Sequence, residues 1–203
     1  MTNNIFFKNN IFLKKQTEVN SIIKENAFLP NMVFKDEYFN YNFFDFDYIF
    51  TEFFWESIQK YLMNNHNKYF TFFVINPHPE RYFFKKFGDY GFVDFSEDYS
   101  YEMYLDILNH FPRNGSEADV MNVSSKQILI YTQDLKLVIY ADRSWETGVL
   151  ASSCKDLSIK QYFENDLSSV NDFAKSSVQF FGQLNDVNFK LNDFFNSLIA
   201  NYG

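Results

Sequence analysis

Asp45, Asp47 and His78 are the side chains in this sequence whose types and spacing best suit acid–base or metal chemistry. The two aspartates flank Phe46, so on an extended strand both carboxylates would lie on one side, where they could bind a divalent cation or exchange protons. His78 lies between two prolines, which stiffen the loop and could present the imidazole as a base or a contact. An enzyme or small-ligand site that uses these three residues is one hypothesis. A structural interpretation is also open: the aspartates would lie on the polar side of a strand, and His78 would be an exposed residue of a rigid turn. We favour this structural interpretation.

The sequence lacks the residues that other catalytic or cofactor-binding sites require. Cys154 is the single cysteine and the three histidines are scattered, so no zinc site stands at a recognisable spacing. A lone thiol acts as a nucleophile only beside a histidine in space, and we interpret Cys154 as a buried or incidental thiol. The sequence contains no glycine-rich phosphate loop, nucleophile elbow or dinucleotide fingerprint. We therefore expect no metal, no cofactor and no catalytic residue, and a binding protein more readily than an enzyme.

The composition favours a basic protein as partner. The formal net charge is −8, and such a chain repels phosphate backbones, so we expect no nucleic-acid partner. The same field attracts a basic surface, although acidity also serves solubility alone. The 28 Phe, 14 Tyr and 2 Trp are more rings than one core needs, so some tyrosines must reach the surface, where they suit a contact.

The densest acidic stretch is interleaved with tyrosines, and it is the candidate contact surface. Its members in the candidate set are Glu97, Asp98, Tyr99, Glu102 and Asp106. On a helix Glu102 and Asp106 are four residues apart, where like charges destabilise slightly. A charge pattern that destabilises the helix indicates a functional role, here the binding of a basic partner. A plain solvated helix face is the alternative, and we give it slightly more weight.

Apolar alternation and helical spacing predict the elements that position these residues. The expected strands cover residues 44–48, 69–75, 92–95, 127–131, 137–140 and 147–151. The expected helices lie within 17–29, 51–62, 80–86, 96–111 and, interrupted at Asn185-Asp186, 170–198. Thr17, Thr51 and either Ser96 or Ser100 are the expected helix caps. The helix before Pro112 is expected to bury Phe111 on its apolar face.

Consecutive strands with flanking helices indicate an α+β fold rather than repeated βαβ units. We expect one domain over residues 1–203, with a mostly antiparallel sheet of about five or six strands flanked by helices. Residues 1–30 would form an N-terminal arm with a short helix, and residues 152–203 a helical C-terminal extension.

Three features predict a cytoplasmic protein. The first residues lack the basic region and unbroken apolar run of a signal peptide. No apolar run approaches the roughly 18 residues needed to cross a bilayer, so we expect no membrane interaction. The single cysteine fits a reducing compartment.

The segment 136–150 pairs two expected strands around a charged turn that contains Asp142 and Arg143. It resembles a strand-turn-strand of small bacterial cytosolic domains of the polymorphic-toxin immunity kind, in which an Asp-Arg pair follows an Ile-Tyr-Gly run. Ala141 stands where glycine is usual, and the likeness covers residues 36–152. Such families vary at their toxin-binding residues, so no functional position is carried over. The resemblance implies a non-enzymatic inhibitor expressed in the cell that makes the toxin.

The main functional hypothesis is a non-enzymatic, cytosolic protein-binding module, of which an immunity-type inhibitor that occludes a basic toxin or effector is one form. Occlusion requires only a complementary surface, so it predicts a sequence without catalytic motifs. The turn adds Arg143 and Trp145 to the candidate partner-binding residues. Arg143 equally suits a local salt bridge with Asp142 or Glu146, and Trp145 equally suits the core.

Overall fold

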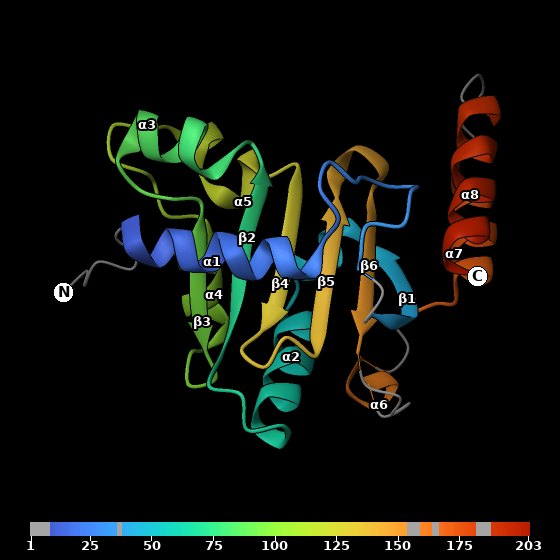
Figure 1. The fold of residues 1–203 in the computed structure, drawn as a ribbon, viewed down its shortest axis with the longest axis horizontal. Coiled ribbons are helices and arrows are strands. Elements are labelled where there is room, and N and C mark those ends of the chain that lie inside the picture. The colour runs from blue at the N-terminus through green and yellow to red at the C-terminus, as the bar shows by residue number, and fades with distance from the viewer. Residues whose placement is uncertain (1–8, 36–37, 154–158, 164–166, 182–187) are drawn as a thin grey trace.

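The centre of the structure is a six-stranded antiparallel sheet with helices on both faces (Figure 1). A computed structural model describes residues 9–35, 38–153, 159–163, 167–181 and 188–203 of the chain. The strands are β1 (Phe39–Asp45), β2 (Tyr69–Asn76), β3 (Phe92–Ser96), β4 (Gln127–Thr132), β5 (Leu137–Asp142) and β6 (Thr147–Ser152). Their order across the sheet is β1-β6-β5-β4-β2-β3, and each neighbouring pair is antiparallel. The fold is therefore α+β, as the sequence predicts.

Five longer helices and several short turns surround the sheet. The longer helices are α1 (Asn9–Ile22), α2 (Glu52–Asn64), α4 (Tyr101–Leu108), α7 (Val170–Phe181) and α8 (Asn188–Tyr202). The shorter elements are η1 (Phe46–Phe50), η2 (Pro79–Phe84), α3 (Lys85–Phe87), η3 (Glu117–Asp119), α5 (Met121–Ser124), η4 (Arg143–Trp145) and α6 (Lys160–Phe163). Among the described helices, none combines the length and apolar character that crossing a bilayer requires.

The sheet separates two hydrophobic cores. On the face that we call the α2 face, α2, α4 and α6 pack against strand residues such as Ile130. On the opposite face, the α1 face, α1, α7 and α8 pack against strand residues such as Tyr131. Figure 1 shows α1 crossing the front of the sheet, with α7 and α8 beside its β1 edge. Because successive strand residues point to opposite faces and both faces are covered, every residue of β5 and β6 is buried.

A buried ammonium group fastens α1 to the sheet. Lys15 is 3% exposed, and its Nζ lies 2.7 Å from Asp94 Oδ1 and donates to Thr71 Oγ1 at 2.8 Å. Glu18 Oε2 lies 3.7 Å from the same nitrogen and accepts the Tyr131 hydroxyl proton at 3.1 Å. A buried charge is tolerated only when it is paired and hydrogen-bonded, so these contacts determine how α1 lies across β2, β3 and β4.

Local sequence signals correctly predicted several elements. The strands β4, β5 and β6 lie where alternation and short connections predicted them. Thr51 caps α2 by accepting the Phe54 N–H, and Ser100 caps α4 by accepting the Met103 N–H. These features depend only on neighbours in the chain, which explains why the sequence shows them.

The expected strand over residues 44–48 is wrong in its second half. β1 ends at Asp45, whose Oδ1 accepts the Asp47 backbone N–H at 3.0 Å and caps the 3₁₀ turn η1. An aspartate that binds the backbone two residues later favours a turn over a continuing strand. The two aspartates therefore do not share one side of a strand.

Two helix assignments also differ from expectation. Thr17 is not a cap, because α1 already runs at Asn9 and the Thr17 hydroxyl donates to the Leu13 carbonyl inside the helix. Helix α4 ends at Leu108, and Phe111 beyond it is 53% exposed rather than buried. The expectations for Cys154 and for the break at Asn185-Asp186 fall outside the described residues.

Asp119 holds the segment before β4 against η2 and α3, and its protonation is expected to weaken the fold. Its carboxylate accepts from Tyr82 Oη at 2.6 Å, Lys86 Nζ at 2.7 Å and the Ser116 hydroxyl at 2.7 Å. The Lys86 contact, followed by the Tyr82 and Ser116 hydrogen bonds, lowers the pKa of Asp119 below its ordinary value. Because the folded-state pKa is depressed, this stabilisation is present above the unfolded pKa of about 4 and is lost as pH falls below it.

We predict that Asp119→Asn lowers the unfolding free energy at pH 7 and makes it less sensitive to pH between about 4 and 2, the range in which this carboxylate is protonated in the unfolded chain but still ionised in the folded one. Urea unfolding at several pH values measures this. The exposed neighbour Glu117→Gln is the matched control and should keep the native pH profile. An Asp119→Asn profile parallel to that of the native chain would contradict the assignment.

Candidate functional site

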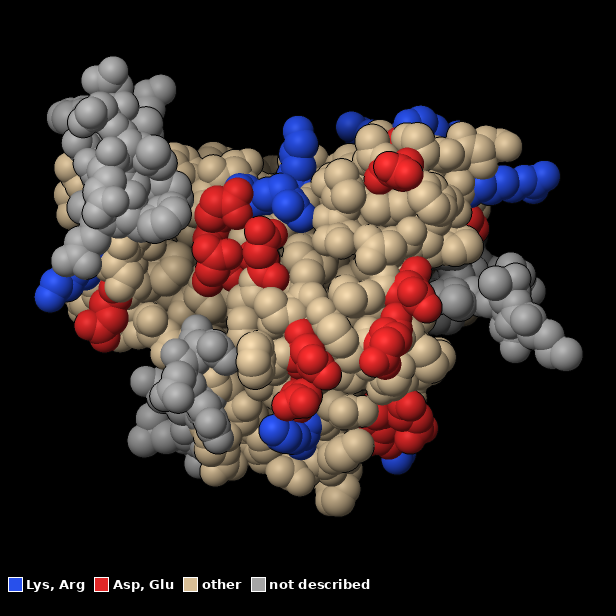
Figure 2. Space-filling view, turned by 180° about the vertical axis from the view of Figure 1, so that it is seen from behind, with Lys and Arg blue, Asp and Glu red and all other residues tan. Residues whose placement is uncertain are grey.

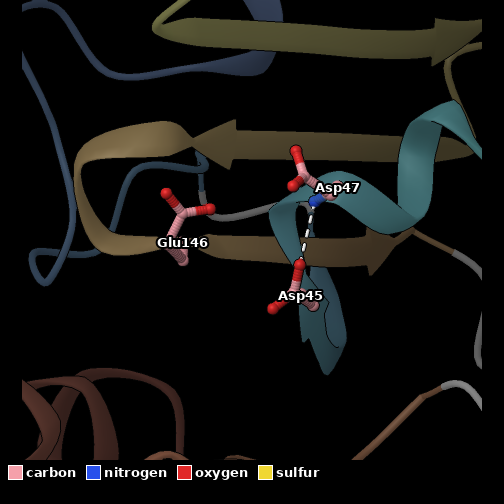
Figure 3. A group of neighbouring side chains, drawn as sticks. All are labelled: Asp45, Asp47 and Glu146. Atoms are coloured by element: carbon pink, nitrogen blue, oxygen red, sulfur yellow. Dashed lines mark hydrogen bonds between the residues drawn. The ribbon is translucent and has the colours of Figure 1, made fainter. Parts of the chain in front are cut away.

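Carboxylates of Asp45, Asp47 and Glu146 gather where β1 ends (Figure 3). One oxygen from each lies within 4.8 Å of the others. Asp47 lies in η1, and Glu146 follows η4 in the turn between β5 and β6. The Phe46 backbone N–H donates to the Glu146 carbonyl at 3.1 Å, which joins the two turns. The sequence indicated the two aspartates, but only the antiparallel pairing of β1 with β6 brings Glu146 to them.

The electrostatics of this trio are those of a crowded acidic turn. Burial raises the pKa of Glu146 above its ordinary value, and the charges of Asp47 and Asp45 raise it further. Three carboxylates offer oxygen ligands of the kind that Ca²⁺ and Mg²⁺ prefer. Asp45 and Asp47 are exposed, however, and the Asp45 side chain already serves as the cap of η1. We assign no cation to this trio.

Arg143 contacts the protein interior instead of presenting its charge outward. Its guanidinium donates to two backbone carbonyls of the segment before β4, at 3.1 and 2.8 Å, and lies 4.4 Å from the centroid of the Phe46 ring. The salt bridge that the sequence predicted with Asp142 or Glu146 forms with Asp47, whose Oδ1 lies 3.7 Å from Nη1. These contacts favour a structural role for Arg143 over the predicted partner contact.

Trp145 also makes a contact within the protein. Its ring stacks on Phe194 of α8 with centroids 4.0 Å apart and an interplanar angle of 14°. The side chain is half-buried and belongs to the core of the α1 face. Both candidate residues of this turn therefore hold other elements in place.

His78 lies far from the two aspartates with which the sequence grouped it. Asp45 pairs with Thr147 at one end of the sheet, and Asn76, two residues before His78, pairs with Gln127 at the same end. Four strand steps of about 4.8 Å separate β1 from β2, which places the two positions about 19 Å apart. His78 lines a separate cleft beside α1. The dispersed site of Asp45, Asp47 and His78 is not assembled.

The second group of carboxylates lines an open groove on the α2 face. The groove has a volume of about 360 Å³ and lies between the first turns of α2 and the start of α4. Its acidic residues are Glu52 and Glu56 from α2, and Asp98 and Glu102 from the α4 side. Figure 2 shows this face, on which Asp and Glu side chains gather in several areas with little Lys or Arg between them. We call these residues, with Tyr99 and Tyr101, the acidic groove.

The acidic groove contains part of the predicted contact surface and adds residues that the sequence analysis missed. Asp98, Tyr99 and Glu102 line it, whereas Asp106 is exposed farther along α4, outside the lining. Glu97 turns to Lys68, with Oε1 and Nζ 2.7 Å apart. Glu52 and Glu56 complete the opposite wall. Their spacing of four residues can be read from the sequence, but the packing of α2 beside α4 cannot.

Hydrogen bonds hold the walls of the acidic groove in place. Gln59 Nε2 donates to the carbonyls of Glu97 at 2.8 Å and Tyr99 at 3.2 Å, which joins α2 to the loop before α4. The hydroxyl of Tyr101 donates to the Phe50 carbonyl at 2.9 Å. The Ser100 hydroxyl, followed by the backbone N–H, lowers the pKa of Glu102, so this carboxylate is ionised at neutral pH. The groove is a pre-formed anionic surface.

Comparison with known proteins adds no assignment, because no protein family, curated protein or solved structure matches this chain significantly.

Proposed function

We propose that this chain is a non-enzymatic protein-binding module that receives a basic partner in the acidic groove. One observation carries the proposal: four carboxylates, two from α2 and two from α4 and the loop before it, line one groove, and the lining residues that the structure describes include no Lys, Arg or His. The side chain of Lys60 lies 3.8 Å from Glu56, but both are more than half exposed, so this pair neutralises little of the field. Mutual repulsion among like charges is relieved when a partner supplies ammonium or guanidinium groups.

Exposed apolar side chains on the two helices that form the groove support a protein as the partner. Phe53, which follows Glu52 on α2, is 70% exposed, and Met103, which follows Glu102 on α4, is 46% exposed. Protein interfaces combine aromatic and methionine side chains with a charged rim. A small cation would use the carboxylates alone, whereas a protein surface can also cover these two side chains.

A toxin or effector that acts in the cytoplasm is the partner class that we propose. The resemblance of the segment 136–150 to immunity-type domains supports it, and so does the arrangement of the groove. Inhibition by occlusion requires a rigid, complementary surface and no chemistry. The hydrogen-bonded walls of the groove meet that requirement.

Charge reversal in the acidic groove is expected to weaken partner binding by roughly 100-fold, because each reversal replaces an attraction by a repulsion worth about 1.4 kcal/mol or more. The variant is Glu52→Lys/Glu102→Lys. The control, Glu117→Lys/Asp193→Lys, changes the net charge equally at exposed sites outside the groove. Native, groove and control proteins are used to capture partners from cell extract at low and high salt, and the affinity of a purified partner is then measured.

A partner of the groove should be retained by the native and control proteins, lost from the groove variant and released by salt. Equal loss from both variants would mean that only net charge matters, and equal retention by all three would mean that the partner binds elsewhere. Either result contradicts the proposal.

A further inference from the structure

The acidic groove contains two polar groups besides its carboxylates. Trp55 and Gln59 of α2 also line it. Because they are four residues apart, they lie on one face of the helix, about 6 Å apart along its axis. Trp55 brings an indole N–H to the groove and Gln59 brings a side-chain amide, so the groove can form directed hydrogen bonds as well as ion pairs.

Trp55 is almost completely buried, yet its indole N–H is left without an acceptor. The residue is 3% exposed, and its ring stacks on Tyr104 with centroids 5.0 Å apart. Among the residues that the structure describes, none accepts a hydrogen bond from Nε1. The nitrogen is not enclosed by the protein, so it belongs to the small open part of the side chain, which faces the groove. A buried tryptophan usually satisfies its N–H, so this donor indicates a ligand that supplies an acceptor.

Gln59 offers the complementary acceptor. Its Nε2 donates to the carbonyls of Glu97 and Tyr99, which fixes the orientation of the amide. Within the described part of the chain, no group donates a hydrogen bond to the Gln59 Oε1 atom, and this oxygen is not enclosed either. One turn of α2 therefore presents an N–H donor, and the next turn presents a carbonyl acceptor.

A donor and an acceptor spaced in this way match the backbone of an extended peptide. One edge of an extended chain presents its C=O and N–H groups at every second residue, a repeat of about 6.6 Å. This repeat is close to the separation of about 6 Å between Trp55 and Gln59 along α2. A metal ion or a protonated polyamine has no acceptor for the indole N–H, so neither would use the whole groove.

The carboxylates and rings of the groove determine which side chains such a peptide should carry. Glu52 and Glu56 lie on one wall, and Asp98 and Glu102 lie on the other, so cationic side chains find carboxylates on both sides of the backbone. The aromatic rings of Tyr99 and Tyr101 line the same space. A guanidinium group can pair with a carboxylate and stack on an aromatic ring, whereas an ammonium group acts as a point charge. Arginine therefore fits this groove better than lysine.

We propose that the acidic groove binds an extended, arginine-containing peptide segment of the partner. A backbone carbonyl of the segment accepts from Trp55 Nε1, a backbone N–H donates to Gln59 Oε1, and arginine side chains pair with the carboxylates. This inference rests on the proposed function, because it assumes a basic partner in the groove, and it adds which part of that partner enters. A partner that used side chains alone would leave both groups of α2 without a hydrogen bond.

The test compares two probes of equal charge, the capped pentapeptide acetyl-Arg-Gly-Arg-Gly-Arg-amide and spermidine, which has no acceptor. Each is titrated into the ¹⁵N-labelled full chain and followed by NMR. The chain contains two tryptophans, so two indole N–H signals are observed. We expect the peptide to bind about tenfold more tightly than spermidine and to move the Trp55 indole proton downfield, because that proton gains a hydrogen bond. The Trp145 signal should not move, because Trp145 belongs to the core of the α1 face.

Trp55→Phe removes the indole N–H and keeps an aromatic ring on Tyr104. It should weaken peptide binding about fivefold and leave spermidine binding unchanged. Trp145→Phe is the matched control, since it removes the other indole and should keep the native affinity for both probes. The charge-reversed variant Glu52→Lys/Glu102→Lys should lose both probes. If Trp55→Phe does not fold, the Trp55 signal of the native chain and the comparison of the two probes still decide the question.

The outcomes separate this inference from the proposed function. Equal affinities for the two probes, or an unmoved Trp55 signal at saturation, would overturn the peptide inference, yet cation binding in the groove would still agree with the proposed function. The inference is also overturned if the peptide does not bind, or if it binds the charge-reversed variant as tightly as the native chain. In those two cases the capture of partners from cell extract decides the proposed function independently.

Discussion

Lys15→Ala is expected to lower the unfolding free energy by about 3 kcal/mol, which corresponds to a fall of about 6–12 °C in melting temperature for a chain of this size. Removal of the ammonium takes the cation away from the Asp94 carboxylate and leaves Glu18 with only the exposed Lys14, although the Asp94 and Glu18 side chains are only 20% and 21% exposed. Breaking a buried pair from one side costs more than the pair itself contributes, because the remaining charge is uncompensated. Thermal and urea unfolding measure the loss.

Lys14→Ala is the matched control for this change. Lys14 precedes Lys15 on α1 and also lies beside Glu18, at 3.8 Å, but its side chain is 72% exposed. Its removal should change stability by less than about 0.5 kcal/mol. The double variant Lys15→Ala/Asp94→Ala should lose less than the sum of the two single losses, since the two groups interact directly. Similar losses for Lys15→Ala and Lys14→Ala would show that the ion network does not hold α1 on the sheet.

The second large effect is expected at Trp145. Trp145→Ala removes the ring that stacks on Phe194, and with it this stacking contact between η4 and α8. Truncation of a buried aromatic residue costs about 3–5 kcal/mol, and because Trp145 is only half-buried we expect the lower end, about 3 kcal/mol. Phe194→Ala should lower the unfolding free energy less in the Trp145→Ala variant than in the native chain, because the two rings contact each other. Unfolding by urea, followed by fluorescence of the remaining Trp55, measures both.

Partner binding separates the two roles that the sequence left open for Trp145. The residue belongs to the core of the α1 face and the acidic groove lies on the α2 face, so the folded variant should keep its affinity for the partner. Phe53→Ala is the stability control, because that ring is 70% exposed and its loss should leave the melting temperature nearly unchanged. A small loss of stability together with lost binding would instead make Trp145 an interface anchor.

The acidic groove and the cleft beside α1 differ in how far the sequence predicted them. The charged stretch from Glu97 to Asp106 was visible as a run of like charges, and Asp98 and Glu102 do line the groove. The cleft escaped prediction because its lining residues come from segments with no shared periodicity. His78 drew attention for its two prolines, yet its position follows from the cap that it forms on η2.

The sequence by itself determined the features that depend on neighbouring residues: the caps at Thr51 and Ser100, the succession of β4, β5 and β6, and the α+β class. Only the tertiary structure decided which elements meet. The pairing of β1 with β6, the insertion of β2 between β4 and β3, and the burial of Lys15 join residues distant in the chain. A strand covered on both faces is apolar throughout, so its pattern does not show which neighbour or which helix it will contact. The acidic groove and the cleft lie between such elements, and their composition followed from packing that no local pattern encodes.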